Sequence, residues 1–287
     1  MDTRHWDEMY RTRDRVFSGN PNGVLVAEAA GLPPGQALDV GCGEGADALW
    51  LAGRGWHVTA VDVSETALRR AAVAAGAMDA AAATAVGAMG AAGAAEPGAG
   101  AAATGVGAME AAVHTATGGT EAATATAAGT AAAEGGAAAS TAGATDTAAA
   151  ANTAGAAGDI RRRVAWVRAD LGGMALPDRS FDLVSVQYFP LRCQPGDVVL
   201  RSLLNAVAPG GTLLFATHVR TDLAPRPEDG FDPADYYQPD TIASLLESTL
   251  LDSTWTVLVN ETRPRETPAP AGTHHSRDSF LRAQRLS

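Results

Sequence analysis

The sequence contains no lysine, so its 21 basic residues are all arginines, and acidic residues outnumber them to give a net charge of −11. Such a balance argues against a nucleic-acid partner, because phosphate binding needs concentrated positive charge. Only two cysteines occur, Cys42 and Cys193, which indicates neither a disulfide framework nor a zinc site. No apolar run reaches the roughly 20 residues that span a bilayer, and the charged amino terminus lacks the apolar core of a signal peptide. We therefore expect a cytoplasmic protein that does not enter a membrane.

Large apolar residues are scarce between about Val73 and Gly158, where the chain is mostly alanine, glycine and threonine. Such a segment buries too little apolar surface to offset the entropy of ordering it. Glycine also weakens a long helix there, by about 1 kcal/mol for each replacement of alanine. The composition predicts a helix that ends near Arg70, a disordered insertion over residues 73–158, and one domain formed by residues 1–72 and 159–287.

The stretch from Ala37 to Gly45 reads as a buried strand, a glycine turn and a helix start. Gly41, Gly43 and Gly45 permit positive φ angles and let a ligand approach the backbone. A helix over residues 46–54 and a second strand over residues 57–62 follow. Asp62 ends that strand. Its separation from Asp39 is close to the ~20 residues at which an acid reaches ribose hydroxyls in nucleotide-binding βαβ units.

The spacing of these glycines bears on the ligand. Dinucleotide sites usually read Gly-x-Gly-x-x-Gly, whereas this turn reads Gly41-x-Gly43-x-Gly45 with Asp39 before it. S-adenosylmethionine has no phosphate and carries a sulfonium and an ammonium group, which nearby carboxylates suit. The residues favour adenosylmethionine and leave NAD as the alternative.

The segment Leu38–Gly45, together with Asp62, resembles motifs I and II of class I adenosylmethionine-dependent methyltransferases. Trp6-Asp7-x-x-Tyr10 and Gly19-Asn-Pro-Asn22 are similar to the amino-terminal segment of bacterial tellurite-resistance and thiopurine-type small-molecule methyltransferases. Further stretches resemble the third, fourth and fifth strands of the family: Val167–Leu171, Phe181–Val186 and Pro209–Phe215.

This resemblance implies an α/β fold: a doubly wound, Rossmann-like, mostly parallel seven-stranded sheet whose last strand is antiparallel, with residues 1–30 as a lid. Expected strands beyond the first two cover residues 164–170, 181–188, 212–217, 255–262 and 279–284. Expected helices cover residues 2–17, 195–207 and 241–250.

The resemblance also implies the cofactor residues. Asp39 and the glycine turn would hold the methionine part of adenosylmethionine, Asp62 its ribose, and Asp170 its adenine. Trp6 and Tyr10 would line the lid. The full expected set is Trp6, Tyr10, Asn22, Asp39, Gly41, Cys42, Gly43, Gly45, Asp62, Val63, Asp170, Leu171 and Gln187.

Tyr188 and His218 follow the fourth and fifth strands and are the expected catalytic residues, since parallel strands end at one cleft. Histidine side chains ordinarily titrate near neutral pH, so His218 suits a general base or a contact with substrate. Tyr236 and Tyr237 are expected to cover the substrate side. The pair His274-His275 lacks converging ligands, and no metal is expected.

The predicted function is transfer of a methyl group from adenosylmethionine to a small-molecule acceptor by in-line displacement, with positioning as the main source of catalysis. Two alternatives stay open. One is an NAD-dependent oxidoreductase, and the other is a non-catalytic adenosylmethionine-binding protein.

Overall fold

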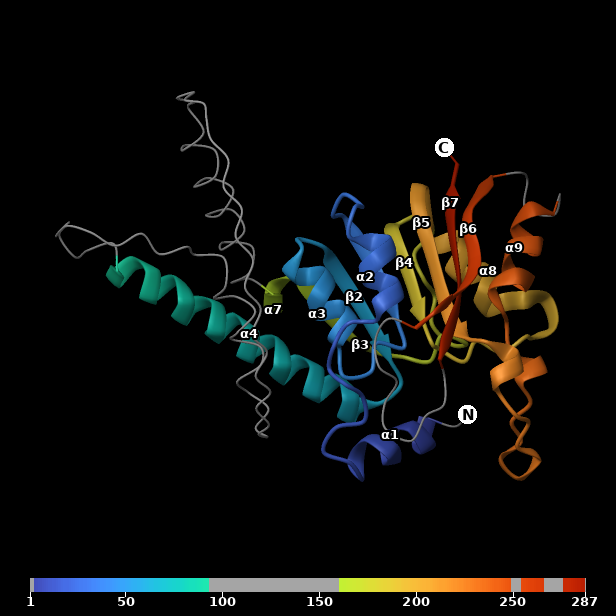
Figure 1. Ribbon diagram of the computed structural model, residues 1–287, viewed down its shortest axis with the longest axis horizontal. Helices are drawn as coiled ribbons and strands as arrows, with labels where there is room; N and C mark the ends of the chain where they lie inside the picture. Colours follow the sequence, from blue (N-terminus) through green and yellow to red (C-terminus); the bar gives the residue numbers. More distant parts are fainter. Residues whose placement is uncertain (1–2, 93–159, 249–253, 266–275, 287) are drawn as a thin grey trace, which may run out of the picture.

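The computed structural model describes residues 3–92, 160–248, 254–265 and 276–286 (Figure 1). Helices alternate with strands along most of this length, as the sequence predicts. The helices are α1 (Thr3–Arg11), α2 (Gly23–Ala29), α3 (Ala46–Gly53), α4 (Glu65–Ala92), α7 (Ile160–Arg163), α8 (Val198–Ala206) and α9 (Pro239–Glu247). The strands are β1 (Gln36–Val40), β2 (His57–Asp62), β3 (Val164–Arg168), β4 (Phe181–Gln187), β5 (Val207–His218), β6 (Trp255–Pro264) and β7 (Arg277–Arg285).

The strands form one seven-stranded sheet in the order β3-β2-β1-β4-β5-β7-β6. Strands β1 to β5 pair in parallel, and β7 runs antiparallel to both β5 and β6. The predicted doubly wound fold with an antiparallel last strand is therefore confirmed. Strand order reverses between β1 and β4, and ligands of such sheets bind at the carboxyl ends of the strands beside this reversal.

Helices pack on both faces of the sheet. Successive residues of each strand point to opposite faces, so they join different clusters. Leu38 and Phe215 lie in the cluster that packs against α8 and α9. Ala37 and Leu214, their neighbours in sequence, lie in the cluster that packs against α2 and α3. Helices on both faces leave the ends of the strands as the place for a site.

Helix α4 is longer than predicted, because it continues from Glu65 to Ala92 instead of ending near Arg70. Tertiary contacts outweigh the low helix propensity of its glycines. The Asp79 carboxylate accepts hydrogen bonds of 2.8 and 3.1 Å from the amides of Ile160 and Arg161, and Ala75 is buried. A side chain at Gly76 would meet the Arg161 guanidinium, so glycine permits this approach of α4 to α7. Residues 73–79 thus pack against the fold as part of α4, which continues to Ala92, and residues 93–158 of the predicted insertion lie outside the described residues.

Smaller differences concern the ends of elements. Helix α1 ends at Arg11, short of the predicted residue 17, and α2 has no counterpart among the predicted elements. The predicted helix over residues 195–207 is a single 3₁₀ turn, Pro195–Asp197, followed by α8. Among the described helices, none combines the length and apolar character needed to cross a bilayer.

Candidate functional site

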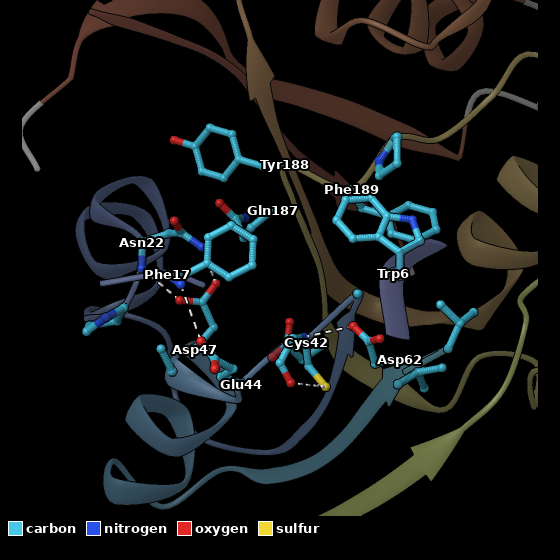
Figure 2. Close-up of a pocket in the computed structure, with 18 of the residues that line it drawn as sticks. Trp6, Phe17, Asn22, Cys42, Glu44, Asp47, Asp62, Gln187, Tyr188 and Phe189 are labelled. Atoms are coloured by element: carbon cyan, nitrogen blue, oxygen red, sulfur yellow. Dashed lines mark hydrogen bonds between the residues drawn. The ribbon is translucent and has the colours of Figure 1, made fainter. Parts of the chain in front are cut away.

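A cavity of about 360 Å³ opens at the carboxyl ends of the central strands, next to the reversal of strand order (Figure 2). Its size falls in the range of small-molecule sites. Glu44, Asp47 and Asp62 lie along one side of the pocket in Figure 2, and Tyr188 and Phe189 lie along the other. The two sides therefore differ in chemistry.

The glycine turn forms part of the acidic side. Gly41 and Gly43 have φ angles of +68° and +53°, which side chains rarely tolerate. A Cβ atom at Gly41 would lie 2.6 Å from the Phe189 ring, and one at Gly43 would lie 2.8 Å from the Tyr10 hydroxyl oxygen. These glycines let aromatic side chains close over the turn.

The backbone amides of this turn are used within the protein. Gly41 and Cys42 donate to the Val61 carbonyl at 2.8 and 3.0 Å, and Gly43 donates to Asp62 Oδ2 at 2.9 Å. Gly45 donates to the Cys42 carbonyl at 2.9 Å. The turn is thus tied to the end of β2 and does not present these amides to a ligand.

Gly45, a predicted cofactor residue, does not line the cavity. It has a φ of +85° at the start of α3, and a Cβ atom there would lie 2.7 Å from both Ala71 and the Trp166 ring. Its lack of a side chain allows α3 to pack behind the pocket. The third glycine of the motif therefore serves packing.

Three buried carboxylates converge beneath the turn: Asp39, Asp47 and Asp62. Burial raises the pKa of Asp39, and the charges of Asp47 and Asp62 raise it further. Burial also raises the pKa of Asp47 and of Asp62, against the hydrogen bonds that these two accept. Three mutually repelling carboxyl groups favour a cationic ligand.

The three acids differ in their hydrogen bonds. Asp62 accepts from the amides of Gly43 and Ser64 at 2.9 and 2.8 Å, and Asp47 accepts twice from Asn22 at 2.7 Å. Asp39 Oδ2 is buried with no hydrogen-bond partner among the described residues. An unpartnered carboxylate oxygen is costly to bury, and a ligand that donates an N–H or carries a positive charge would satisfy it.

The other predicted cofactor residues also reach the cavity, with the same exception of Gly45. Val63, Asp170 and Leu171 line it beyond β2 and β3, where Asp170 Oδ1 accepts from the Gly172 amide at 3.0 Å. Gln187 ends β4, and its Oε1 atom is a second buried acceptor without a donor among the described residues. Burial and neighbouring acids raise the pKa of Cys42, so its thiol stays protonated.

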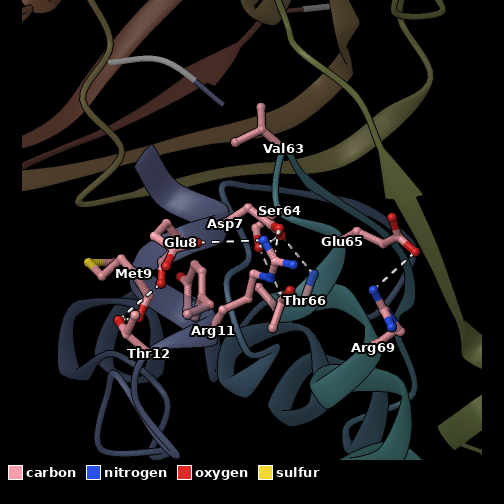
Figure 3. A network of polar contacts seen from close by, with 12 residues as sticks. Asp7, Glu8, Met9, Arg11, Thr12, Val63, Ser64, Glu65, Thr66 and Arg69 are labelled. Carbon is pink, nitrogen blue, oxygen red and sulfur yellow. Dashed lines mark hydrogen bonds and ion pairs between the residues drawn. The ribbon is translucent and has the colours of Figure 1, made fainter. Parts of the chain in front are cut away.

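The amino-terminal segment covers the pocket with Trp6 and Tyr10, and with Phe17, which the sequence reasoning missed. Figure 3 shows how Asp7 of α1 is fastened to the start of α4: Oδ1 accepts from Ser64 Oγ at 2.8 Å and from the Thr66 amide at 3.1 Å. These hydrogen bonds hold α1 beside the glycine turn.

A second set of hydrogen bonds joins α4 to the end of α1 and to the residues that follow it. Arg70 donates to the carbonyl oxygens of Tyr10 and Arg13 at 2.7 and 2.6 Å, and to Glu44 Oε1 at 2.8 Å. Glu44 Oε2 accepts from the amides of Val16 and Phe17 at 3.2 and 3.3 Å. Glu44 thus holds the cover of the pocket in place.

Tyr188 and His218 stand on the opposite side, with ring centroids 4.9 Å apart. Tyr188 has a φ of +55°, which is rare for a bulky residue and typical of functional sites. Burial raises its pKa above the ordinary value of 10, and the nearby Asp278 charge raises it further. The phenol therefore stays protonated at neutral pH and cannot act as a base.

Two predictions about the substrate side are wrong. Tyr237 is buried in the core, where its ring packs with α8 and α9. Its hydroxyl donates a hydrogen bond to Asp197. Tyr236 pairs with the Phe231 ring at 5.5 Å, and neither tyrosine lines the cavity. His274 and His275 lie outside the described residues.

The sequence reasoning also gave no role to Glu44, Asp47 or Arg265, which line the cavity. Glu44 and Asp47 stand within four residues of Gly43, so acids following the turn were an available signal. Arg265 follows β6 and had no local pattern to identify it.

Comparison with known proteins agrees with this geometry. Residues 1–91 match the family model described as thiopurine S-methyltransferase, and no curated protein matches the sequence. A protein structure from work on the conversion of a disulfide bond into a thioacetal group during echinomycin biosynthesis is 19% identical, with a TM-score of 0.52, over 99% of this chain and 92% of that chain. A methyltransferase from Methanosarcina mazei is 16% identical with a TM-score of 0.49, over 93% of this chain and 99% of that chain. The first of these structures shows a shared fold, and the family match spans the glycine turn and its cover.

Proposed function

We propose that this chain is a class I S-adenosylmethionine-dependent methyltransferase that methylates a small-molecule acceptor entering beside Tyr188 and Phe189. The observation that carries the proposal is the buried Asp39 Oδ2, which has no donor among the described residues and lies with Asp47 and Asp62 under the glycine turn. A ligand with a sulfonium and an ammonium group would relieve the repulsion among these carboxylates.

The same residues disfavour a dinucleotide. A pyrophosphate is usually held by free backbone amides at a glycine turn and a helix start. The amides of Gly41, Cys42 and Gly43 are already donated to Val61 and Asp62, and three carboxylates would repel the phosphates. This arrangement supports adenosylmethionine over NAD.

In the proposed site, Asp39 and Gln187 would accept hydrogen bonds from the amino-acid part of the cofactor. Asp62 would hold its ribose, and Asp170 and Leu171 would hold its adenine. Both oxygens of Asp62 already accept an amide, at 2.9 Å from Gly43 and 2.8 Å from Ser64. A carboxylate oxygen has further lone pairs, so these bonds fix the orientation of Asp62 without filling it.

Bound adenosylmethionine would supply an electrophilic methyl group, for in-line transfer from its sulfur to a nucleophilic atom of the acceptor. The chain contributes positioning and exclusion of water. Trp6, Tyr10 and Phe17 cover the pocket, and Tyr188, whose phenol stays protonated, would help to position the acceptor. His218 lines the same side of the cavity and would remove a proton from the acceptor where one must leave.

The proposal is tested by incubating the protein with methyl-labelled adenosylmethionine and aromatic thiols, small amines or metalloid oxyanions. The expected result is labelled product with one class of acceptor, and loss of product in Asp62→Ala. Tight cofactor binding without transfer to any acceptor would favour a non-catalytic adenosylmethionine-binding protein.

A further inference from the structure

Arg265 is the single arginine among the described residues that line the cavity, and His218 is the other basic side chain there. It follows Pro264, the last residue of β6, and its backbone amide donates to the Ser276 carbonyl at 2.9 Å. The guanidinium lies 4.9 Å from the centre of the Tyr188 ring. Arg265 therefore stands on the side of the pocket away from the acidic turn.

The guanidinium is buried without enough acceptors. Its side chain is 13% exposed, and the Nε and Nη1 atoms are buried with no hydrogen-bond partner among the described residues. Buried donors are nearly always paired in folded proteins. Two open donors on a charged group that faces a cavity point to a ligand with an anionic oxygen.

Asp278 does not fill this need. Its Oδ1 atom lies 3.7 Å from Arg265 Nη1, which is beyond hydrogen-bonding distance. Asp278 is itself buried on β7, opposite His218 of β5. Its charge attracts the guanidinium across this distance, as a loose ion pair that leaves the hydrogen-bond donors of Arg265 available.

We propose that Arg265 binds an anionic oxygen group, such as a carboxylate, on the methyl acceptor. This inference rests on the proposed methyl transfer and adds the chemical class of the acceptor. The Tyr188 ring lies beside Arg265, and the Phe189 ring lines the same cavity, so the acceptor is a small planar acid. Arginine suits this role because its planar donors match the geometry of a carboxylate.

Adenosylmethionine also carries a carboxylate, so the source of the anion must be distinguished. The first measurement is the calorimetric affinity of wild type and Arg265→Gln for adenosylmethionine and S-adenosylhomocysteine. We expect the variant to keep both affinities within about twofold, which also shows that its site is folded. A tenfold loss for both ligands would assign Arg265 to the cofactor carboxylate and overturn the inference.

The second measurement titrates benzoate and its neutral analogue benzamide into protein saturated with S-adenosylhomocysteine. Wild type is expected to bind benzoate at least about tenfold more tightly than benzamide. Arg265→Gln should lose this preference, and Arg265→Lys, which keeps a charge beside Asp278, should retain part of it. Arg69→Gln is the matched control, because Arg69 is an exposed arginine of α4 outside the cavity and should keep the full preference.

Equal affinity for the two probes in wild type, or no benzoate binding up to about 10 mM, would overturn the inference and leave methyl transfer intact. Failure of wild type to bind adenosylmethionine would instead remove the proposed function, and this inference with it.

Discussion

Asp47 accepts two hydrogen bonds of 2.7 Å from Asn22, one from the backbone amide and one from the side-chain amide. These bonds compensate the buried charge of Asp47, whereas the neighbouring Asp39 keeps an unpartnered oxygen. The acidic side of the pocket thus combines Asp47, whose charge is compensated, with Asp39, which has one oxygen without a donor among the described residues. The negative charge on this side of the pocket favours the cofactor-bound protein over the free protein.

Neutralising Asp39 should change the stability of the free protein and its affinity for adenosylmethionine in opposite directions. Asp39→Asn removes a buried charge whose pKa is raised by burial and by Asp47 and Asp62, so the free protein gains on the order of 1 kcal/mol at neutral pH. Adenosylmethionine affinity should fall at least about tenfold. Thermal unfolding and calorimetry measure the two effects, and Asp178→Asn, at an exposed position outside the pocket, is the control. A variant that is less stable and binds normally would contradict this role.

The raised pKa of Asp39 also predicts how the stability of the protein depends on pH. Because the folded-state pKa of Asp39 is raised, its stabilising contribution is complete below 3.8 and is lost as pH rises through the raised value. The stability advantage of Asp39→Asn should therefore grow with pH above 3.8. Adenosylmethionine should bind the ionised form and release protons, which calorimetry in buffers of different ionisation enthalpy detects. Proton uptake by wild type would contradict the assignment.

Two glycines with positive φ angles allow steric and conformational effects to be separated. Gly43 (φ +53°) faces the Tyr10 hydroxyl, whereas a Cβ atom at Gly210 (φ +78°) would meet nothing within 4 Å. Both alanine variants should lose about 1–2 kcal/mol of stability from backbone strain. Only Gly43→Ala should also weaken adenosylmethionine binding, because Tyr10 must move. Equal affinities in the two variants would show that contact between Tyr10 and the turn is unimportant.

Arg70 and Arg69 are adjacent arginines of α4 with different partners. Arg70 bonds Glu44 and two carbonyl oxygens of the amino-terminal segment, whereas Arg69 pairs with Glu65 on the surface. Arg70→Met should increase amide hydrogen exchange over residues 10–17 and weaken cofactor binding by about tenfold, mainly through faster release. Arg69→Met should leave both unchanged. Unaltered exchange in Arg70→Met would show that the cover is held by other contacts.

The sequence was most informative where the signal is local. Strands β1 and β2, the glycine turn and Asp62 lie within 27 residues and follow rules of strand pattern and spacing, so their arrangement could be predicted. The resemblance to class I methyltransferases then predicted the antiparallel β7, and the structure confirms it.

Features that depend on distant partners could not be predicted in this way. Arg265 meets Tyr188 from 77 positions away in the chain, and the Asp79 contacts that extend α4 come from α7. Tyr237 stands in an acidic, proline-rich stretch typical of a loop, but its burial with α8 and α9 follows only from the folded path of the chain. Local composition does not encode such contacts.

Calorimetric titration with adenosylmethionine and S-adenosylhomocysteine, with NAD as the comparison, tests the central claim most directly. Wild type should bind the first two ligands and not NAD. Asp62→Ala, which leaves the amides of Gly43 and Ser64 without their acceptor, should lose at least about tenfold in affinity for both. Absence of adenosylmethionine binding in wild type, or tighter binding of NAD, would contradict the assignment of this pocket.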